Sequence, residues 1–459
     1  MQRKRVFFVL TALLVSLVLV LAGCGGDGGE NGGDEGEAAA SGEPAQESYV
    51  NNPYTDGEDL SGRTVNIFGA FVDADAERFN AAMAPFEEET GIDIQYEGSG
   101  DFESLITVRT EGGDPPDVAA WPQPGLMQDI ADRGYVVDLT QWMDMEYLQQ
   151  QYDQSWLDLA TYNDMMTGVW YRASVKSLVW YPVPEFSEAG YEIPETWDEL
   201  LELHRQMVED GNTPWSIGIE SSGATGWVAT DWLEDLMLRI HPPEVYDRWV
   251  DGELSFNSPE VKEAMSVMEN VWKNPDFVRG GTQSILTVPF GDAANPLFND
   301  PPRAWLHRQA SFIPAFFPDG AEVGTDVDYF YLPPITEENG GVGGQPVLGA
   351  GDLFSALQEK PEVAAVMRWL STGESTRGWL EQGGFVSPHK DTPLDWYPTD
   401  VDRGYAEILQ DATVFRFDAS DLMPGQVGTG AFWTGMVDWV NGQDLDTVLT
   451  SIDDAWPED

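Results

Sequence analysis

From about residue 60 onward, hydrophobic positions recur along the chain with two alternating periods. In residues 63–70 (RTVNIFGA), Val65 and Ile67 alternate with polar neighbours, which predicts a strand. Residues 75–90 repeat apolar side chains at helical spacing, and Gly91 is expected to end that helix. The same reasoning predicts strands at 92–96 and 117–120 and helices at 101–110 and 126–133. Strands that alternate with helices are typical of an α/β fold.

The pattern continues through a long apolar run at residues 169–181 (VWYRASVKSLVWY), which predicts one long strand with Lys176 near its middle. A lysine in so apolar a run is expected to be paired or to point into a cleft, and the alternative is a charge that protects an edge strand. Thr196 and Glu199 in PETWDEL predict a capping box at a helix start. Further helices are predicted at 231–240, 259–272, 361–371 and 374–382, strands at 327–332 and 347–350, and three helical segments within 400–459.

One stretch combines flat apolar rings with hydrogen-bonding carboxylates, namely residues 215–232 (WSIGIESSGATGWVATDW). It carries Trp215, Trp227 and Trp232 together with Glu220 and Asp231. A sugar offers a C–H face and a rim of hydroxyls, so such a stretch suits a sugar site. The alternative is that the indoles are buried in the core and the acids lie on the surface.

A second candidate for a ligand contact is the loop at residues 121–125 (WPQPG), which follows a short buried strand. Two prolines and a glycine break the strand at its carboxyl end, where open α/β sheets bind ligands. Gly349 and Gly351 lack a phosphate-loop pattern and indicate close approach of the backbone within the cleft.

The N-terminal pattern predicts an export signal. Three basic residues precede an uncharged apolar run, and the sequence then reaches Cys24, the only cysteine. This pattern resembles the bacterial lipoprotein signal, in which the cysteine is lipidated; the alternative is a short transmembrane anchor. Residues 25–59 are rich in Gly and Glu and are expected to be a flexible linker that holds the folded body outside the cytoplasm.

Charge restricts the possible partners. The chain carries 80 acidic and 23 basic residues, a formal net charge of −57, which excludes nucleic acid as an ordinary ligand. Molar salt screens such self-repulsion, so we expect a halophilic or salt-tolerant source, with an acidic secreted protein as the alternative. With so many acids, carboxylate pairs alone do not indicate a glycoside hydrolase. No zinc-type spacing, calcium loop or nucleotide fingerprint is present, so no metal and no cofactor are expected.

Several segments together resemble the extracellular solute-binding proteins of ABC sugar importers: TVNIFGAF, PFEEETGIDIQY, GGDPPDVAAWPQPG, YRASVKSLVWY, PETWDEL, FFPDG and MPGQVGTGAFW. Within that family, AWPQPGL, ESSGATGW, HRQASFIPAFFP and RFDASDLMPG are most similar to alpha-glucoside-binding proteins. The resemblance implies a bilobal periplasmic-binding-protein-like fold of type II, with two α/β lobes joined by crossing hinge strands. It implies one lobe from 60–174 plus 330–385 and another from 176–328 plus 386–458.

The resemblance also implies site residues. Trp121, Glu220 and Trp433 match family positions that contact sugar, whereas Lys176 stands where related maltodextrin-binding proteins carry a glutamate. Loop position alone adds Phe71, Asp101, Gln123, Trp227, Asp231 and Asp352, while Trp215 and Trp232 are expected in the core. The implied protein is a non-enzymatic, lipid-anchored receptor on the outer face of the cell membrane, which passes an alpha-linked di- or oligosaccharide to an ABC permease. A glycoside-active enzyme and a receptor for a non-sugar solute are the alternatives.

Overall fold

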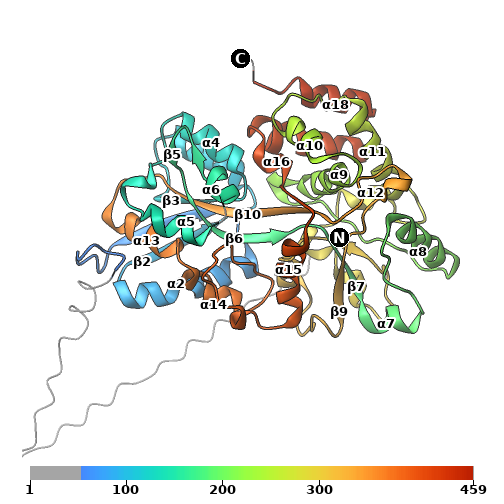
Figure 1. The fold of residues 1–459 in the computed structure, drawn as a ribbon, viewed down its shortest axis with the longest axis horizontal. Helices are drawn as coiled ribbons and strands as arrows, with labels where there is room; N and C mark the ends of the chain where they lie inside the picture. Colours follow the sequence, from blue (N-terminus) through green and yellow to red (C-terminus); the bar gives the residue numbers. More distant parts are fainter. Residues whose placement is uncertain (1–52, 153, 458–459) are drawn as a thin grey trace, which may run out of the picture. The chain divides into compact units, whose positions relative to one another are not determined.

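The computed structural model describes residues 53–152 and 154–457. Its larger sheet has six strands, shown with the rest of the fold in Figure 1. These strands are β1 (Thr64–Gly69), β2 (Asp93–Gly98), β3 (Val118–Trp121), β6 (Val169–Val175), β10 (Pro346–Ala356) and β11 (Val414–Phe417). β1 pairs in parallel with β2 and β3, while β10 pairs antiparallel with β3 and β6 and parallel with β11.

Helices connect the parallel strands of this sheet, because a parallel pair needs a crossover. α2 (Asp73–Thr90) joins β1 to β2, and α3 (Phe102–Glu111) joins β2 to β3. Gly91 ends α2 with a φ of 69°, in the left-handed region that glycine enters without a steric penalty. The other elements that precede β6 are α4 (Pro124–Asp132), α5 (Met145–Gln151), α6 (Gln154–Leu159), β4 (Thr161–Tyr162) and β5 (Met165–Met166).

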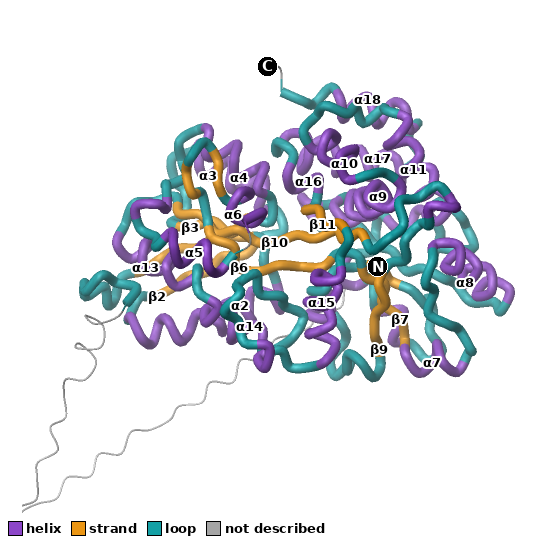
Figure 2. The backbone as a smooth tube through the Cα atoms, viewed as in Figure 1, coloured by secondary structure: helices purple, strands orange, loops and turns teal. Residues whose placement is uncertain are grey.

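A smaller antiparallel sheet has three strands in the order β8 (His307–Arg308), β7 (Leu178–Pro182) and β9 (Val327–Tyr331). The helix that opens at Trp197 has the predicted capping box between Thr196 and Glu199. The helices between β7 and β8 along the chain are α7 (Val183–Glu188), α8 (Trp197–Glu209), α9 (Trp227–Ile240), α10 (Pro243–Val250), α11 (Pro259–Trp272) and α12 (Thr282–Ile285). Figure 2 shows α8, α9 and α11 on the same side of the molecule as β7 and β9.

The C-terminal part packs on the larger sheet and on the helices α2 and α9. α13 (Pro361–Leu370) packs on β10, and α14 (Arg377–Leu380) packs on α2. After β11 the chain forms a short helix, a π-helical turn and two further helices against α9 and each other. The elements from residue 400 onward, β11 apart, are α15 (Asp400–Asp411), α16 (Ala419–Leu422), the π-helix Gln426–Phe432, α17 (Trp433–Val440) and α18 (Leu445–Asp453).

Buried hydrophobic side chains form two large clusters and one small one. The first core draws on the strands and helices up to Tyr171, on the segment from Ala350 to Phe385, and on Tyr397 and Phe417. The second core draws mainly on α8, α9, α11, α17 and α18 and includes Trp215 and Trp232, which are therefore core residues as predicted. The third core gathers around Val175, Leu178 and Trp180, where β6 gives way to β7. The division into two lobes stays a prediction.

Two strand predictions need correction. The run at 169–181 is not one strand, because the chain leaves the larger sheet after Val175 and enters the smaller sheet at Leu178. The two residues between them, Lys176 and Ser177, turn their side chains to buried carboxylates. The predicted strand at 347–350 extends instead from Pro346 to Ala356, since β6 and β3 pair with its second half.

Gly351 lies close to backbone, as the sequence indicated, and its nearest neighbour is the adjacent strand β6. A Cβ on Gly351 would lie 2.7 Å from the carbonyl oxygen of Arg172 in the neighbouring strand. The leader, Cys24 and most of the linker lie outside the described residues. Among the residues that are described, no helix has the length and apolar character needed to cross a membrane.

Candidate functional site

A cavity of about 160 Å³ lies where loops from both sheets meet. The loops that follow β1, β2 and β3 line it because the carboxyl ends of parallel strands reach the same edge of the sheet. The middle of β10 and the end of β6 line another part of it. We call it the central cavity; its polar lining comprises Asp75, Ser99, Glu103, Gln123, Arg172, Ser174, Lys176, Ser221, Asp352 and Asp421.

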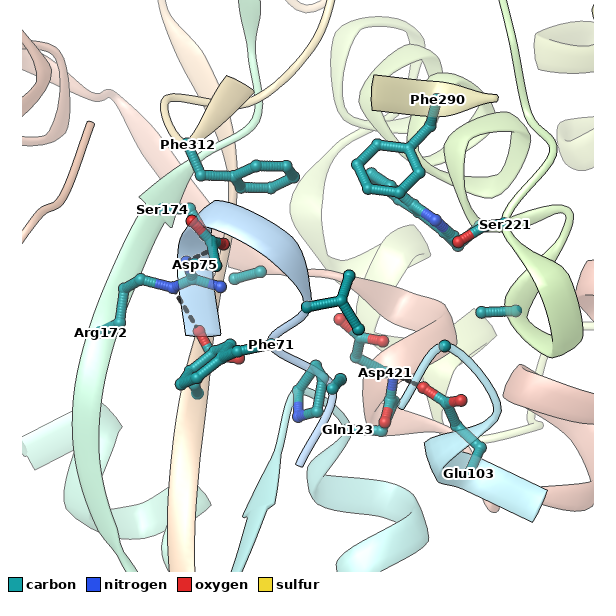
Figure 3. A pocket seen from close by; sticks show the side chains of 18 of the residues that line it. Phe71, Asp75, Glu103, Gln123, Arg172, Ser174, Ser221, Phe290, Phe312 and Asp421 are labelled. Carbon is teal, nitrogen blue, oxygen red and sulfur yellow. Dashed lines mark hydrogen bonds and ion pairs between the residues drawn. The ribbon is translucent and has the colours of Figure 1, made fainter. Parts of the chain in front are cut away.

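Aromatic rings make up much of the remaining lining: Phe71, Trp227, Phe290, Phe312, Phe316 and Trp433. The ring centroids of Trp227 and Phe290 are 5.3 Å apart in an edge-on arrangement, and those of Phe290 and Phe316 are 5.1 Å apart. Figure 3 shows Phe290 and Phe312 at one end of the view and Gln123 and Glu103 at the other. The cavity thus offers apolar ring faces opposite polar groups.

Arg172 is held in the cavity by two carboxylates (Figure 3). Its Nη1 donates to Asp75 Oδ2 at 2.9 Å, and its Nε donates to Asp352 Oδ2 at 2.6 Å. The guanidinium also lies 4.6 Å from the centre of the Phe71 ring. Burial alone would lower the pKa of Arg172, but the carboxylates of Asp352 and Asp75 outweigh it and raise the pKa, so this side chain stays charged.

Lys176 is surrounded by buried acids, and we call Lys176, Asp231, Glu234, Asp418 and Asp421 the lysine cluster. Lys176 Nζ donates to Asp231 Oδ1 at 2.8 Å and to Asp418 Oδ2, and it lies 4.0 Å from Asp421 Oδ2. Burial would lower the pKa of Lys176, but Asp231 and Asp418 raise it well above its ordinary value. Lys176 is therefore paired with carboxylates and also lines the cavity. Its sequence context predicted that it would be paired or would point into a cleft.

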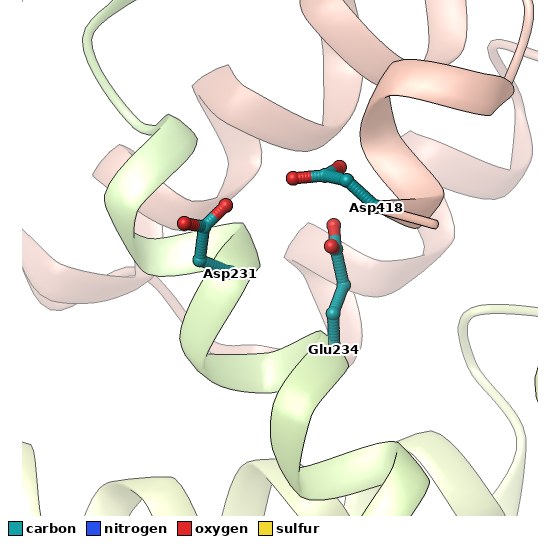
Figure 4. A group of neighbouring side chains, drawn as sticks. All are labelled: Asp231, Glu234 and Asp418. Atoms are coloured by element: carbon teal, nitrogen blue, oxygen red, sulfur yellow. The ribbon is translucent and has the colours of Figure 1, made fainter. Parts of the chain in front are cut away.

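Three members of the lysine cluster turn carboxyl groups toward one another: Asp231, Glu234 and Asp418 (Figure 4). Their oxygens lie within 4.8 Å of one another, a spacing that could suit a hard cation. However, Lys176 already bonds to two of the three, and Glu234 accepts the backbone N–H groups of Ala419 and Ser420. The donors of the protein itself thus satisfy these oxygens, and the group fits an ion-pair network better than a metal centre.

Two hydrogen-bond acceptors beside the cavity lack donors. Gln123 Nε2 donates to Glu103 Oε1 at 3.1 Å, but Gln123 Oε1 has no partner among the described residues. Asp75 Oδ1 is likewise buried without a partner, although Asp75 Oδ2 holds Arg172. Burial raises the pKa of Glu103 to about 7. Because buried acceptors are costly to leave unsatisfied, these two oxygens need a donor that the described side chains do not supply, such as an ordered water or a bound solute.

Residues 69–372 match the model of the family described as bacterial extracellular solute-binding protein. This chain belongs to that family. Solute-binding proteins bind and do not catalyse, so the chain is not an enzyme. The family also fits the predicted α/β architecture and a body that works outside the cytoplasm.

Two relatives match nearly the whole chain. It is 43% identical to the osmoprotective compounds-binding protein GgtB of Synechocystis sp., over 98% of this chain and 99% of the relative. It is 42% identical to the alpha-glucosides-binding periplasmic protein AglE of Rhizobium meliloti, over 90% of this chain and 92% of the relative. A solved structure of the bacterial solute receptor AcbH superposes with a TM-score of 0.74 over 86% of this chain and 98% of that one; at 17% identity, this likeness shows the fold alone.

The structure brings six of the ten predicted contact residues of this solute-binding protein together. All six line the central cavity: Phe71, Gln123, Lys176, Trp227, Asp352 and Trp433. They come from distant segments of the chain: Phe71 and Trp433 are 362 residues apart in the sequence. Their contact with a solute stays a prediction, but their shared location is what that prediction requires.

The other four predicted residues do not line the cavity. Trp121 is fully buried in the first core, where its ring packs edge-on against Phe102. Asp231 is fully buried and holds Lys176. Glu220 Oε1 accepts the backbone N–H of Ser222, and the exposed Asp101 accepts the backbone N–H of Gly223. These four side chains therefore pack against, or form hydrogen bonds with, other parts of the protein.

Several lining residues were not singled out from sequence. Arg172, Phe312 and Asp421 lie within YRASVKSLVWY, HRQASFIPAFFP and RFDASDLMPG, segments that carried the family resemblance. Those segments were the available signal, but no single residue within them stood out. Asp75 and Glu103 sit in the first turns of α2 and α3, where acidic residues are ordinary helix features and give no sign of a site.

Proposed function

We propose that this solute-binding protein captures an alpha-linked glucoside, such as a disaccharide or short oligosaccharide, and passes it to the permease of an ABC importer. The observation that carries the proposal is a cavity walled by aromatic rings, whose lining residues Asp75 and Gln123 each keep one buried oxygen without a donor, Asp75 Oδ1 and Gln123 Oε1. Sugar hydroxyls supply donors, and sugar C–H faces pack on rings. The relative AglE, which is named for alpha-glucosides, supports the same solute class.

Two further parts of the proposal concern how the protein works at the membrane. We infer that Cys24 is lipidated and tethers the body to the outer face of the cell membrane, as its place after an apolar run suggests. We also infer that two lobes, residues 60–174 with 330–385 and 176–328 with 386–458, close around the solute. The separate first and second cores support two lobes, although Phe417 belongs to the first core and Leu348 to the second, across the inferred boundaries. The central cavity takes lining from elements of both.

Sugar binding can be measured through intrinsic tryptophan fluorescence, since Trp227 and Trp433 line the cavity. Titration with sucrose, maltose and trehalose in high salt is expected to give a saturable change for at least one of them, with no turnover. Cellobiose, a beta-linked isomer of maltose, is the matched control and is expected to bind more weakly. Equal affinity for maltose and cellobiose would contradict the alpha-glucoside assignment, and no saturation by any of these sugars would contradict sugar binding.

The net charge of −57 leads to a prediction about salt. We propose that the protein comes from a saline environment, because molar salt shortens the Debye length to about 3 Å and removes most repulsion among surface acids. The midpoint of urea unfolding is expected to rise between low-salt buffer and about 2 M NaCl. Potassium chloride at the same ionic strength serves as the comparison. Equal stability at low and high salt would contradict the proposal.

A further inference from the structure

Every cationic side chain in the lining of the central cavity is already committed to carboxylates. The lining contains two such side chains, Arg172 and Lys176. Arg172 is bound by Asp75 and Asp352 at 2.9 and 2.6 Å, and its side chain is 9% exposed. Lys176 is bound by Asp231 and Asp418, and its side chain is 6% exposed. No cation in the described lining is left to pair with an anionic solute.

Carboxyl groups outnumber the cations in the same lining. Asp75, Glu103, Asp352 and Asp421 all face the cavity. Burial is the main cause of the raised pKa of Glu103 and Asp421, and for Asp421 the neighbouring Asp418 raises it further. Both shifts mean that this environment disfavours a negative charge, so an added carboxylate or phosphate would lose its hydration there without gaining a free cation as a partner.

The orphan acceptors disfavour an anion independently of charge. Asp75 Oδ1 and Gln123 Oε1 need donors, which a hydroxyl or an amide supplies. An ionised carboxylate offers acceptors only, so at the position where it replaces a hydroxyl the sugar can no longer donate to either oxygen. The serine hydroxyls of the lining, on Ser99, Ser174 and Ser221, can donate or accept and do not restore the missing charge.

We propose that the central cavity selects uncharged polyhydroxylated glucosides and rejects glucosides of the same size that carry a carboxylate or phosphate. This inference rests on the proposed function, because it names the class of glucoside that the cavity takes. The specificity comes from the absence of free cations within the described lining, together with the acceptors that lack donors. A carboxylate or phosphate on the solute would stay unpaired there, which weakens the binding of an anionic glucoside.

The test compares three forms of one sugar. The three forms of trehalose are the parent sugar, a derivative in which one CH₂OH group is oxidised to a carboxylate, and a derivative in which the same group is converted to the primary carboxamide. Matching sets are prepared from maltose and sucrose. For each parent sugar that binds, we expect the carboxylate to bind at least about 100-fold more weakly and the uncharged carboxamide to stay within about tenfold of the parent. Calorimetric titration in about 1 M NaCl removes long-range repulsion from the net charge of the protein.

The outcomes separate the inference from the function on which it rests. A carboxylate that binds within threefold of its parent sugar would overturn the inference and leave sugar binding intact. Discrimination that is present at low salt and vanishes in 1 M NaCl would also overturn it, because the long-range field and not the cavity would then be responsible. Failure of all three parent sugars to bind would instead contradict the proposed function.

A variant gives a second readout. Asp352→Asn removes one of the two carboxylates that hold Arg172, so part of the charge of this guanidinium becomes available in the cavity. The carboxylate form of the sugar is expected to gain affinity relative to the parent sugar by about tenfold. Asp247→Asn is the matched control, since it frees Arg416 outside the cavity lining and is expected to leave the ratio unchanged. An unchanged ratio in a folded Asp352→Asn protein would count against the inference.

Discussion

Replacement of Lys176 by methionine is expected to lower the free energy of unfolding by about 3–5 kcal/mol, the cost of breaking a buried ion pair from one side. Lys176 Nζ bonds to Asp231 and Asp418, whose side chains are 0% and 1% exposed. Methionine fills a similar volume but leaves these carboxylates without their nearest cation. Asp231 keeps a longer contact of 3.5 Å with Arg308, which is too distant to replace the lysine.

Urea unfolding in high salt measures this effect. Lys262→Met is the matched control, because Lys262 pairs with Asp446 and its side chain is 37% exposed. Exposed pairs contribute about 0–1 kcal/mol, so the control is expected to change stability little. Similar losses in the two variants would show that the lysine cluster has no special role.

The effect of Lys176→Met is also expected to depend on pH. Burial would raise the pKa of Asp418, but Lys176 outweighs it and lowers the pKa to about 2, below the ordinary 3.8. In the native protein this carboxylate therefore contributes stability above pH 3.8 that is lost as the pH falls through 2. Without the lysine its pKa rises, so acid protonates it and relieves the unpaired charge. The stability difference is expected to be smaller at about pH 5 than at about pH 8.

Local periodicity explains why the sequence predicted much of the fold. The helix at 259–272 begins and ends where α11 does, since a serine N-cap and Pro259 mark its start. The break after Val175 was missed because both flanking strands are apolar; the structure reveals it through the change of sheet and through the partners of Lys176 and Ser177. Those partners, Asp231 and Asp235, lie more than 50 residues away in the chain.

The sequence predicted the lining residues whose place depends on a loop after a strand. It did not predict those whose place depends on pairing with a residue far away in the chain. Gln123 lines the cavity because it lies in the loop that follows a strand at the carboxyl edge of the sheet. Trp121, two residues earlier, is still part of that strand and points into the first core. The role of Asp75 depends on Arg172, 97 residues away, and among 80 acidic residues the sequence gives no sign of which one will meet that arginine.

Replacement of Trp227 by alanine is expected to weaken sugar binding by about 10- to 100-fold, equivalent to about 1.4–2.8 kcal/mol. Trp227 is only partly buried and lines the central cavity from the start of α9. Its ring packs edge-on against Phe290 and lies 5.5 Å from Lys176 Nζ, so it joins the aromatic wall to the lysine cluster. Alanine removes both the ring face and the apolar area that a bound sugar would cover.

Calorimetric titration avoids the change in fluorescence that loss of an indole causes. Trp396→Ala is the matched control, because Trp396 is also partly buried but packs against Arg377 and does not line the cavity. Both variants remove one partly buried indole, so a general effect of lost packing should appear in both. Weaker binding in Trp227→Ala alone would locate sugar binding at the aromatic wall. Wild-type affinity in a folded Trp227→Ala protein would mean that the sugar binds elsewhere, since a ring that lines so small a cavity cannot be removed without changing the contacts of a solute inside it.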